Sequence, residues 1–326
     1  MQRVTTTGQI VPEENQLITP SLYDRFVEYI DASDNTVQTY SLSLRQFFYW
    51  LKREQISQPL RADVRRYRDE LKAKHKPATV QGYIFAVRQF FRWTALEGLY
   101  PDIADHLKGA KISTAHKKDP LTVQQAQEIL ALQQGKKTIK GARDYALLAV
   151  AITCGLRTIE LRRANVEDLR TLGDRTVLFI QGKGEDERAE FVLITAPVEK
   201  ALRTYFRRRG RVAGKDPLFA SVSYNNPGGR MATRSISRII KDAFREAGYD
   251  SDRLTAHSLR HTAGTINLLA GGTLQETQQL LRHSNINTTT IYAHNLEKLQ
   301  SQNEERITAA LFPEEAGLDP GGKEDT

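Results

Sequence analysis

The stretch T-A-H-S-L-R-H at residues 255–261 opens an expected helix with two histidines around one arginine. The segment L-L-R-H-S-N-I-N-T-T-T-I-Y at 280–292 adds a histidine and a tyrosine, and C-G-L-R-T-I-E-L at 154–161 adds an arginine upstream. A guanidinium stays charged and offers a phosphate two parallel hydrogen bonds, and a tyrosine hydroxyl can attack a phosphate. Chemistry on a phosphate ester is therefore predicted for Arg157, His257, Arg260, His283 and Tyr292.

Over roughly residues 20–312, this arrangement resembles the tyrosine recombinases, which are the phage-integrase family. The resemblance implies a site-specific recombinase that cleaves and rejoins DNA through a covalent 3′-phosphotyrosyl intermediate, without a metal or another cofactor. Tyr292 would be the nucleophile, and Arg157 and Arg260 would bind the phosphate. His257 would accept the tyrosine proton or hydrogen-bond to the reacting groups.

Four further residues are compared with the family pattern. Lys183, in Q-G-K-G between two expected strands, is the implied general acid for the departing 5′ oxygen, and His283 is an implied phosphate contact. Glu160, three residues after Arg157, is expected to orient its neighbours. Arg282 precedes His283 where the family usually has glycine. This departure leaves open whether Arg282 alters the local turn or adds a phosphate contact.

Each of these residues alone also fits a plain structural role, and only their joint occurrence favours catalysis. A type IB topoisomerase-like enzyme shares the same chemistry. A DNA-binding regulator on a recombinase scaffold would be expected to lack an arginine or the tyrosine, and none is missing. A metal site is not predicted: His257 and His261 have zinc-binding spacing, but Arg260 between them would repel a cation. A metal-dependent nuclease would need clustered carboxylates, which these motifs lack.

With 40% of its residues hydrophobic and 26% charged, the chain has the composition of a globular protein. Its length of 326 residues allows one large domain or two ordinary ones. No apolar run has the length of a membrane span, and the N-terminus lacks a signal core, so a cytoplasmic, nucleoid-associated protein is expected. A single cysteine, Cys154, excludes an internal disulfide and is expected in the core. The net charge of +8 favours a polyanionic partner.

The hydrophobic periodicity predicts a mainly α protein with one small antiparallel sheet, whose strands include T-V-L-F-I at 176–180 and A-E-F-V-L-I-T at 189–195. The expected organisation is a flexible arm (1–19), a helical core-binding domain (20–107), a linker (108–120), a catalytic domain (121–312) and an acidic flexible tail (313–326).

Double-stranded DNA is the expected partner. The resemblance also implies a homo-oligomer, a tetramer on two DNA sites, in which a terminal helix over 303–312 is donated to a neighbouring subunit. Packing of this helix on its own domain is the alternative. The basic residues predicted to contact DNA are Arg45, Arg65, Arg88, Arg92, Lys111, Lys117, Lys118 and Arg282.

Overall fold

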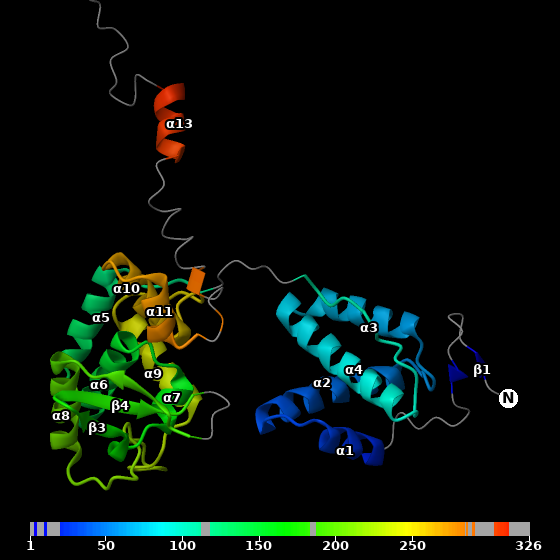
Figure 1. Ribbon diagram of the computed structural model, residues 1–326, viewed down its shortest axis with the longest axis horizontal. Coiled ribbons are helices and arrows are strands. Elements are labelled where there is room, and N and C mark those ends of the chain that lie inside the picture. Colours follow the sequence, from blue (N-terminus) through cyan, green and yellow to red (C-terminus); the bar gives the residue numbers. More distant parts are fainter. Residues whose placement is uncertain are drawn as a thin grey trace, which may run out of the picture. The chain divides into compact units, whose positions relative to one another are not determined.

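The computed structural model describes residues 3–4, 10–11, 20–111, 118–182, 187–283, 285, 289–290 and 303–312. The chain divides into two compact units, Met1–Ala115 and His116–Thr326 (Figure 1). Two short strands at the start, β1 (Arg3–Val4) and β2 (Ile10–Val11), pair antiparallel. No helix among the described residues is both long and apolar enough to cross a membrane.

The first unit is helical. Apolar residues at helical spacing drive α2 against α4, and their aromatic side chains interlock in the core. The rings of Phe47 and Phe91, for example, meet edge to face at 5.9 Å. Pro77 is the first residue of α4, a position where its missing N–H costs nothing, and Gly98 follows the end of the helix with φ +68°. The helices are α1 (Pro20–Tyr29), α2 (Asp34–Arg53), α3 (Arg61–Lys74) and α4 (Pro77–Leu96).

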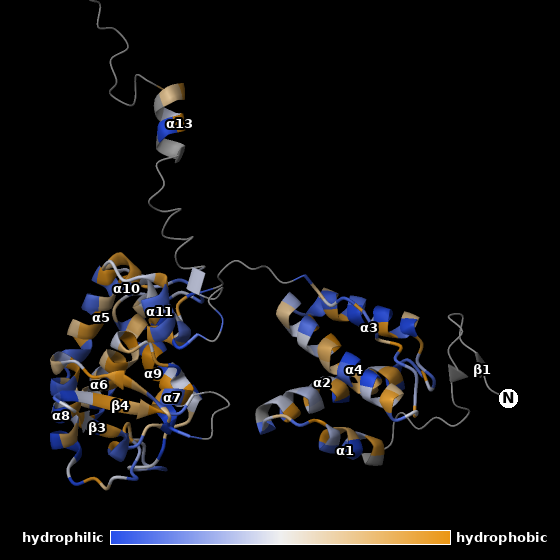
Figure 2. Ribbon diagram, in the orientation of Figure 1, coloured by the Kyte–Doolittle hydropathy of each residue, from blue (hydrophilic) through white to orange (hydrophobic). Residues whose placement is uncertain are grey.

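The second unit places helices around one three-stranded sheet. Figure 2 shows its strand β4 as strongly hydrophobic, whereas α3 of the first unit is largely hydrophilic. In chain order the elements are α5 (Val123–Gln134), α6 (Ile139–Thr153), α7 (Thr158–Arg163), the 3₁₀ turn η1 (Val166–Asp168), β3 (Leu169–Leu172), β4 (Arg175–Ile180), β5 (Glu190–Leu193), α8 (Ala196–Arg209), α9 (Thr233–Glu246), α10 (Ala256–Leu269), α11 (Leu274–Leu281) and α13 (Asn303–Leu311).

Reciprocal capping fixes the start of two of these helices. Thr122 accepts a hydrogen bond from the Gln125 amide, and the Gln125 side chain accepts one from the Thr122 amide. The same exchange joins Thr273 and Glu276 before α11. Both capping boxes follow the sequence pattern of a threonine with glutamine or glutamate three residues later, and each satisfies amides that a helix start leaves without partners.

The sheet has the order β3-β4-β5 and is antiparallel throughout. Leu178 pairs with Val192, and both side chains face the core. The predicted fold class, mainly α with a small antiparallel sheet, is confirmed. The strand β3 was not predicted, because its four residues L-R-T-L contain no fully buried position and carry too little alternation to be recognised.

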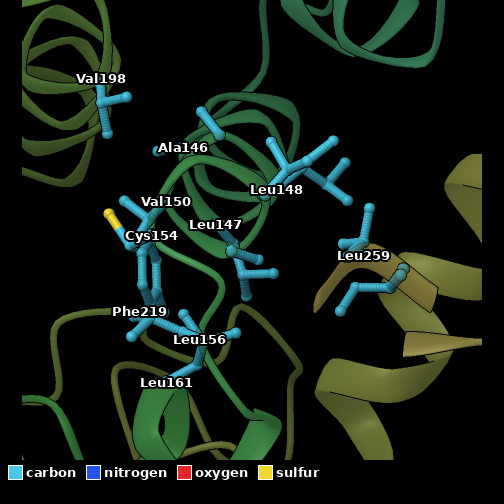
Figure 3. Packing of buried hydrophobic residues seen from close by; sticks show 14 of the residues in the cluster. Ala146, Leu147, Leu148, Val150, Cys154, Leu156, Leu161, Val198, Phe219 and Leu259 are labelled. Carbon is cyan, nitrogen blue, oxygen red and sulfur yellow. The ribbon is translucent and has the colours of Figure 1, made fainter. Parts of the chain in front are cut away.

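The core of the second unit is organised around α6 (Figure 3). Leu147 and Leu148 on this helix are almost fully buried, and the chain that leaves it stays in the core through Cys154 and Leu156. Leu259 of α10 joins the same cluster. Since Leu156 precedes Arg157 and Leu259 precedes Arg260, hydrophobic packing fixes the backbone on which both arginines stand.

A tight contact closes this unit where the α6–α7 turn meets α11. Gly155 has φ +58°, and a Cβ added there would lie 2.8 Å from Leu281 Cδ2. Leu281 is fully buried and cannot retreat, because a Cβ added to Gly264 would lie 2.8 Å from its other methyl, Cδ1. The leucine is thus wedged between two glycines, one on the turn and one on α10.

We expect Gly155→Ala to lower the free energy of unfolding of this unit by about 2–4 kcal/mol, because left-handed strain and a clash add together. Gly173→Ala is the matched control, since Gly173 has φ +61° but open space around an added Cβ. It should cost only about 1 kcal/mol. Hydrogen exchange of the α6 and α10 amides measures both effects, and equal losses in the two variants would disprove the wedge.

Candidate active site

Three of the predicted residues line one groove of about 620 Å³ in the second unit. Arg157 comes from the start of α7, and His257 and Arg260 come from the first turns of α10. Arg238 and Lys241 of α9 also line the groove, against one acidic residue, Asp252. The surplus of cations makes this groove suited to an anion.

Arg260 is 1% exposed, so its guanidinium is fixed by the protein rather than by water. It donates one hydrogen bond to the carbonyl of Gly155, at 2.7 Å, and another to the carbonyl of Leu281. These carbonyls belong to the α6–α7 turn and to the end of α11, which meet at the contact between Gly155 and Leu281. Close packing there therefore sets the direction of the arginine.

Arg157 is held by the buried carboxylate of Glu160, which is 1% exposed. The backbone N–H of Arg157 donates to Glu160 Oε2 at 2.8 Å, and its Nη1 donates to Glu160 Oε1 at 2.7 Å. Its Nη2 donates to the carbonyl of Arg282 at 3.2 Å. About a third of the Arg157 side chain remains exposed. Glu160 thus orients the arginine.

His283 lines a second cavity of about 690 Å³, which also contains Arg157. Its Nδ1 lies 2.9 Å from the hydroxyl of Thr289. Burial, followed by the charges of Arg260 and Arg157 and then that of His257, lowers the pKa of His283 from 6.5 to about 4. The imidazole is therefore neutral near pH 7. The same charges show that the two arginines and the two histidines are close neighbours.

Arg282 ends α11 with φ +50° and ψ +52°, a left-handed conformation. Its side chain is 9% exposed and points inward. The guanidinium donates to the carbonyl of Leu280 at 2.7 Å and to Glu160 Oε2 at 3.1 Å. Its predicted contact with DNA stays a prediction.

Both sides of the β4–β5 connection are tied to the end of α7. Arg163 Nη1 donates to the carbonyl of Gly182 at 2.5 Å, and Arg188 Nη2 donates to the carbonyl of Arg163 at 3.3 Å. Arg188 also forms an ion pair with the fully buried Asp168. Three predicted residues, Lys183, Tyr292 and Lys117, lie outside the described residues.

The remaining predicted DNA contacts divide between the two units. In the first unit, Arg45 on α2, Arg65 on α3 and Arg92 on α4 are exposed, as is Lys111, and Arg88 on α4 is half-buried. In the second unit, Lys118 donates to the carbonyl of Asp252, a residue of the groove, at 2.6 Å.

The sequence reasoning missed the cations on α9. Arg234, Arg238, Lys241 and Arg245 recur at helical spacing opposite the buried Ile236 and Ile240, and so form one basic stripe. The same periodicity that indicates the packing face could have revealed this stripe.

Within the part of the chain that the structure describes, no group of three or more His, Cys, Asp or Glu residues is placed to hold a metal ion. His261 is buried, and its ring meets that of His257 edge to face at 4.5 Å.

Two family models match the chain. The model described as "Phage integrase family" covers residues 119–298, and "Phage integrase, N-terminal SAM-like domain" covers residues 23–98. Among curated relatives, tyrosine recombinase XerC of Leptospira interrogans is 29% identical over 82% of this chain and 86% of its own. Tyrosine recombinase XerC of Corynebacterium glutamicum is 34% identical over 58% of this chain and 61% of its own.

Solved structures share the fold at lower identity. A XerH site-specific recombinase bound to a palindromic difH substrate has a TM-score of 0.69 at 19% identity, covering 92% of this chain and 86% of the other. A lambda integrase tetramer bound to a Holliday junction has a TM-score of 0.63 at 14% identity, covering 83% of this chain and 76% of the other.

The depressed pKa of His283 predicts a pH dependence. Between pH 6.5 and about 4 the unfolded chain binds a proton at residue 283 that the folded chain does not bind. This contribution to the free energy of unfolding is therefore fully present above pH 6.5 and is lost as the pH falls to about 4. NMR titration should show an imidazole with a midpoint near 4 that is absent from His283→Gln, whereas a midpoint near 6.5 would refute the assignment.

Proposed function

Because the chain belongs to the phage integrase family and is a tyrosine site-specific recombinase, we propose that the groove and the adjoining cavity bind the scissile phosphate of double-stranded DNA. The observation that carries this proposal is the convergence of Arg157, Arg260, His257 and His283, from three separate segments, on two adjoining hollows. On this proposal, the protein works in the cytoplasm on nucleoid DNA.

In this proposal, Arg157 and Arg260 bind the phosphate. In the transition state for attack on phosphorus, negative charge grows on the non-bridging oxygens. Guanidinium groups that are already oriented stabilise this charge without reorganising. The buried bonds of Arg260 and the Glu160 contact of Arg157 supply that orientation. When His283 is neutral and its Nδ1 accepts a hydrogen bond from the Thr289 hydroxyl, the ring proton is on Nε2. The Nε2–H group then donates a hydrogen bond to the phosphate.

The nucleophile is Tyr292. Its Oη attacks the phosphorus, the P–O5′ bond breaks, and the DNA 3′ phosphate becomes joined to the tyrosine. Phenols in general have a pKa near 10, so the proton of the attacking hydroxyl must be accepted, and His257 in the first turn of α10 is the acceptor. Lys183 gives a proton to the departing 5′ oxygen. Attack by a 5′ hydroxyl of the partner strand reverses these steps and rejoins the DNA.

Assembly involves α13. Ile307 and Leu311 of this helix are 58% and 67% exposed, and Phe312 directly after it is 54% exposed, so these three apolar residues are not buried. A nine-residue helix gains little by folding alone. The proposed occupant of its apolar face is a second copy of this chain, in a tetramer that holds two DNA sites. A lambda integrase has been solved as a tetramer bound to a Holliday junction, which is a precedent for four subunits on DNA.

The first test removes only the attacking oxygen. Tyr292→Phe should bind a nicked suicide duplex with unchanged affinity and yield no covalent protein–DNA adduct on a denaturing gel. Tyr224→Phe is the matched control, because Tyr224 is 97% exposed and lies outside both hollows, and it should react normally. An adduct of normal yield from Tyr292→Phe would exclude this residue as the nucleophile.

The second test concerns the leaving group. Lys183→Ala should cleave an ordinary duplex slowly but recover on a duplex with a bridging 5′-phosphorothiolate, because a thiolate departs without a proton. Tyr292→Phe should stay inactive on both substrates. Equal slowing of Lys183→Ala on both substrates would reduce Lys183 to a DNA contact.

The third test concerns assembly. Deleting residues 303–326 should leave binding to a single site intact but abolish cooperative binding to paired sites and strand exchange. Gel-shift titration of one-site and two-site duplexes measures this directly. Undiminished cooperativity in the truncated protein would indicate that α13 packs on its own domain.

A further inference from the structure

Residue 282 combines an unfavourable backbone with an elaborate set of bonds. Its φ of +50° is disfavoured for any residue with a side chain, and glycine would relieve it. Yet the Arg282 side chain is 9% exposed and reaches acceptors in three segments. A strained position that keeps a long charged side chain indicates that the side chain contributes something glycine could not.

The contacts of Arg282 converge on the groups that hold Arg157. Besides Leu280, the guanidinium donates to the carbonyls of Cys154 and Gly155, at 3.4 and 3.3 Å, in the turn that leads into α7. It also donates to Glu160 Oε2, at 3.1 Å. The carbonyl of Arg282 in turn accepts Nη2 of Arg157, at 3.2 Å. Arg157 is therefore fixed at one nitrogen by a carboxylate that Arg282 shares, and at the other by the backbone of Arg282.

The sharing of the Glu160 carboxylate by two arginines changes the net charge of the site. If Glu160 were paired with Arg157 alone, its full negative charge would oppose the attraction of Arg157 for a phosphate. With two guanidinium groups on one buried carboxylate, the three groups together keep one positive charge. That charge can reach a neighbouring anion through Arg157, about a third of whose side chain is exposed.

We propose that Arg282 is a positioning residue for the reaction: it offsets the charge of Glu160 and holds Arg157 in its phosphate-binding orientation before DNA arrives. This inference rests on the proposed role of Arg157. Arg282 acts through Glu160 and Arg157: its Nη1 and Nη2 are engaged by four acceptors, and its Nε, which has no hydrogen-bond partner among the described residues, is buried.

The test compares Arg282→Gly with wild type in single-turnover cleavage of a nicked suicide duplex at saturating DNA. Cleavage should fall on the order of 10- to 100-fold, as for loss of a group that orients a reacting residue. Affinity should fall much less than the cleavage rate, because many other phosphate contacts hold the duplex, and its salt dependence should stay unchanged. A direct phosphate contact would instead reduce the slope of log K against log salt by about 0.9, which would overturn the proposal.

Gln55→Gly is the matched control for the backbone. Gln55 is an exposed residue of the first unit with φ +56°, so its replacement relieves the same strain away from the site. It should cleave at the wild-type rate. Arg282→Lys keeps the strain and the charge but can no longer reach four acceptors, so its rate should lie between those of Arg282→Gly and wild type. If Arg282→Gly unfolds, Arg282→Lys decides the matter, and a wild-type rate would overturn the proposal.

A double-mutant cycle identifies the route of action. Glu160→Gln and Arg282→Gly should be strongly non-additive, because both act by releasing Arg157. Full additivity would overturn the proposal. Arg157→Lys separates the two hypotheses: if it cleaves normally, the proposed phosphate site is wrong. If only Arg157→Lys is impaired while Arg282→Gly is normal, the site stands and the role of Arg282 is wrong.

Discussion

The geometry of the candidate active site depends on one buried carboxylate, that of Glu160. Glu160 is 1% exposed and accepts the backbone and the side chain of Arg157 together with the side chain of Arg282. A carboxylate buried this deeply is tolerated only when it is paired and hydrogen-bonded. Removing either arginine would leave Glu160 paired with the other alone and would abolish the net positive charge of the group, so Glu160 and its two arginines depend on one another.

The arrangement serves catalysis better than stability. Buried ion pairs contribute little net folding energy, because desolvation offsets their attraction. On the proposed function, their value here is orientation, since Arg157 and Arg260 would meet a phosphate without first having to be ordered. The hydrophobic core carries the stability and sets the directions: Leu156, Leu161 and Leu259 each adjoin a charged residue of the site and pack into the cluster around α6 (Figure 3). The packing of these leucines thus fixes the backbone positions of the charged residues next to them in the chain.

The short helix α7 links two parts of the site. Arg157 stands at its N-terminal end and Glu160 in its first turn, while Arg163 at its C-terminal end binds both sides of the β4–β5 connection. A helix of six residues has little stability of its own. It persists because each end is tied by buried polar bonds to the core and the sheet. Movement of one end of α7 would therefore displace the other end as well.

The sequence by itself determined what depends on neighbours in the chain. The capping boxes at Thr122 and Thr273, the helical periodicities and the i, i+3 pairing of Arg157 with Glu160 follow from local spacing. It also indicated which residue types would gather, because arginines, histidines and a tyrosine in that order suit one kind of phosphate chemistry. The roles of Tyr292 and Lys183 still rest on that pattern. Only the tertiary structure decided that His283 is neutral, since burial and the charges of Arg260 and Arg157, which come from distant segments, lower its pKa. It also turned Arg282 inward, because the acceptors at residues 154, 155 and 160 meet α11 only after folding. Burial and long-range charge are properties of the folded chain, and no local pattern encodes them.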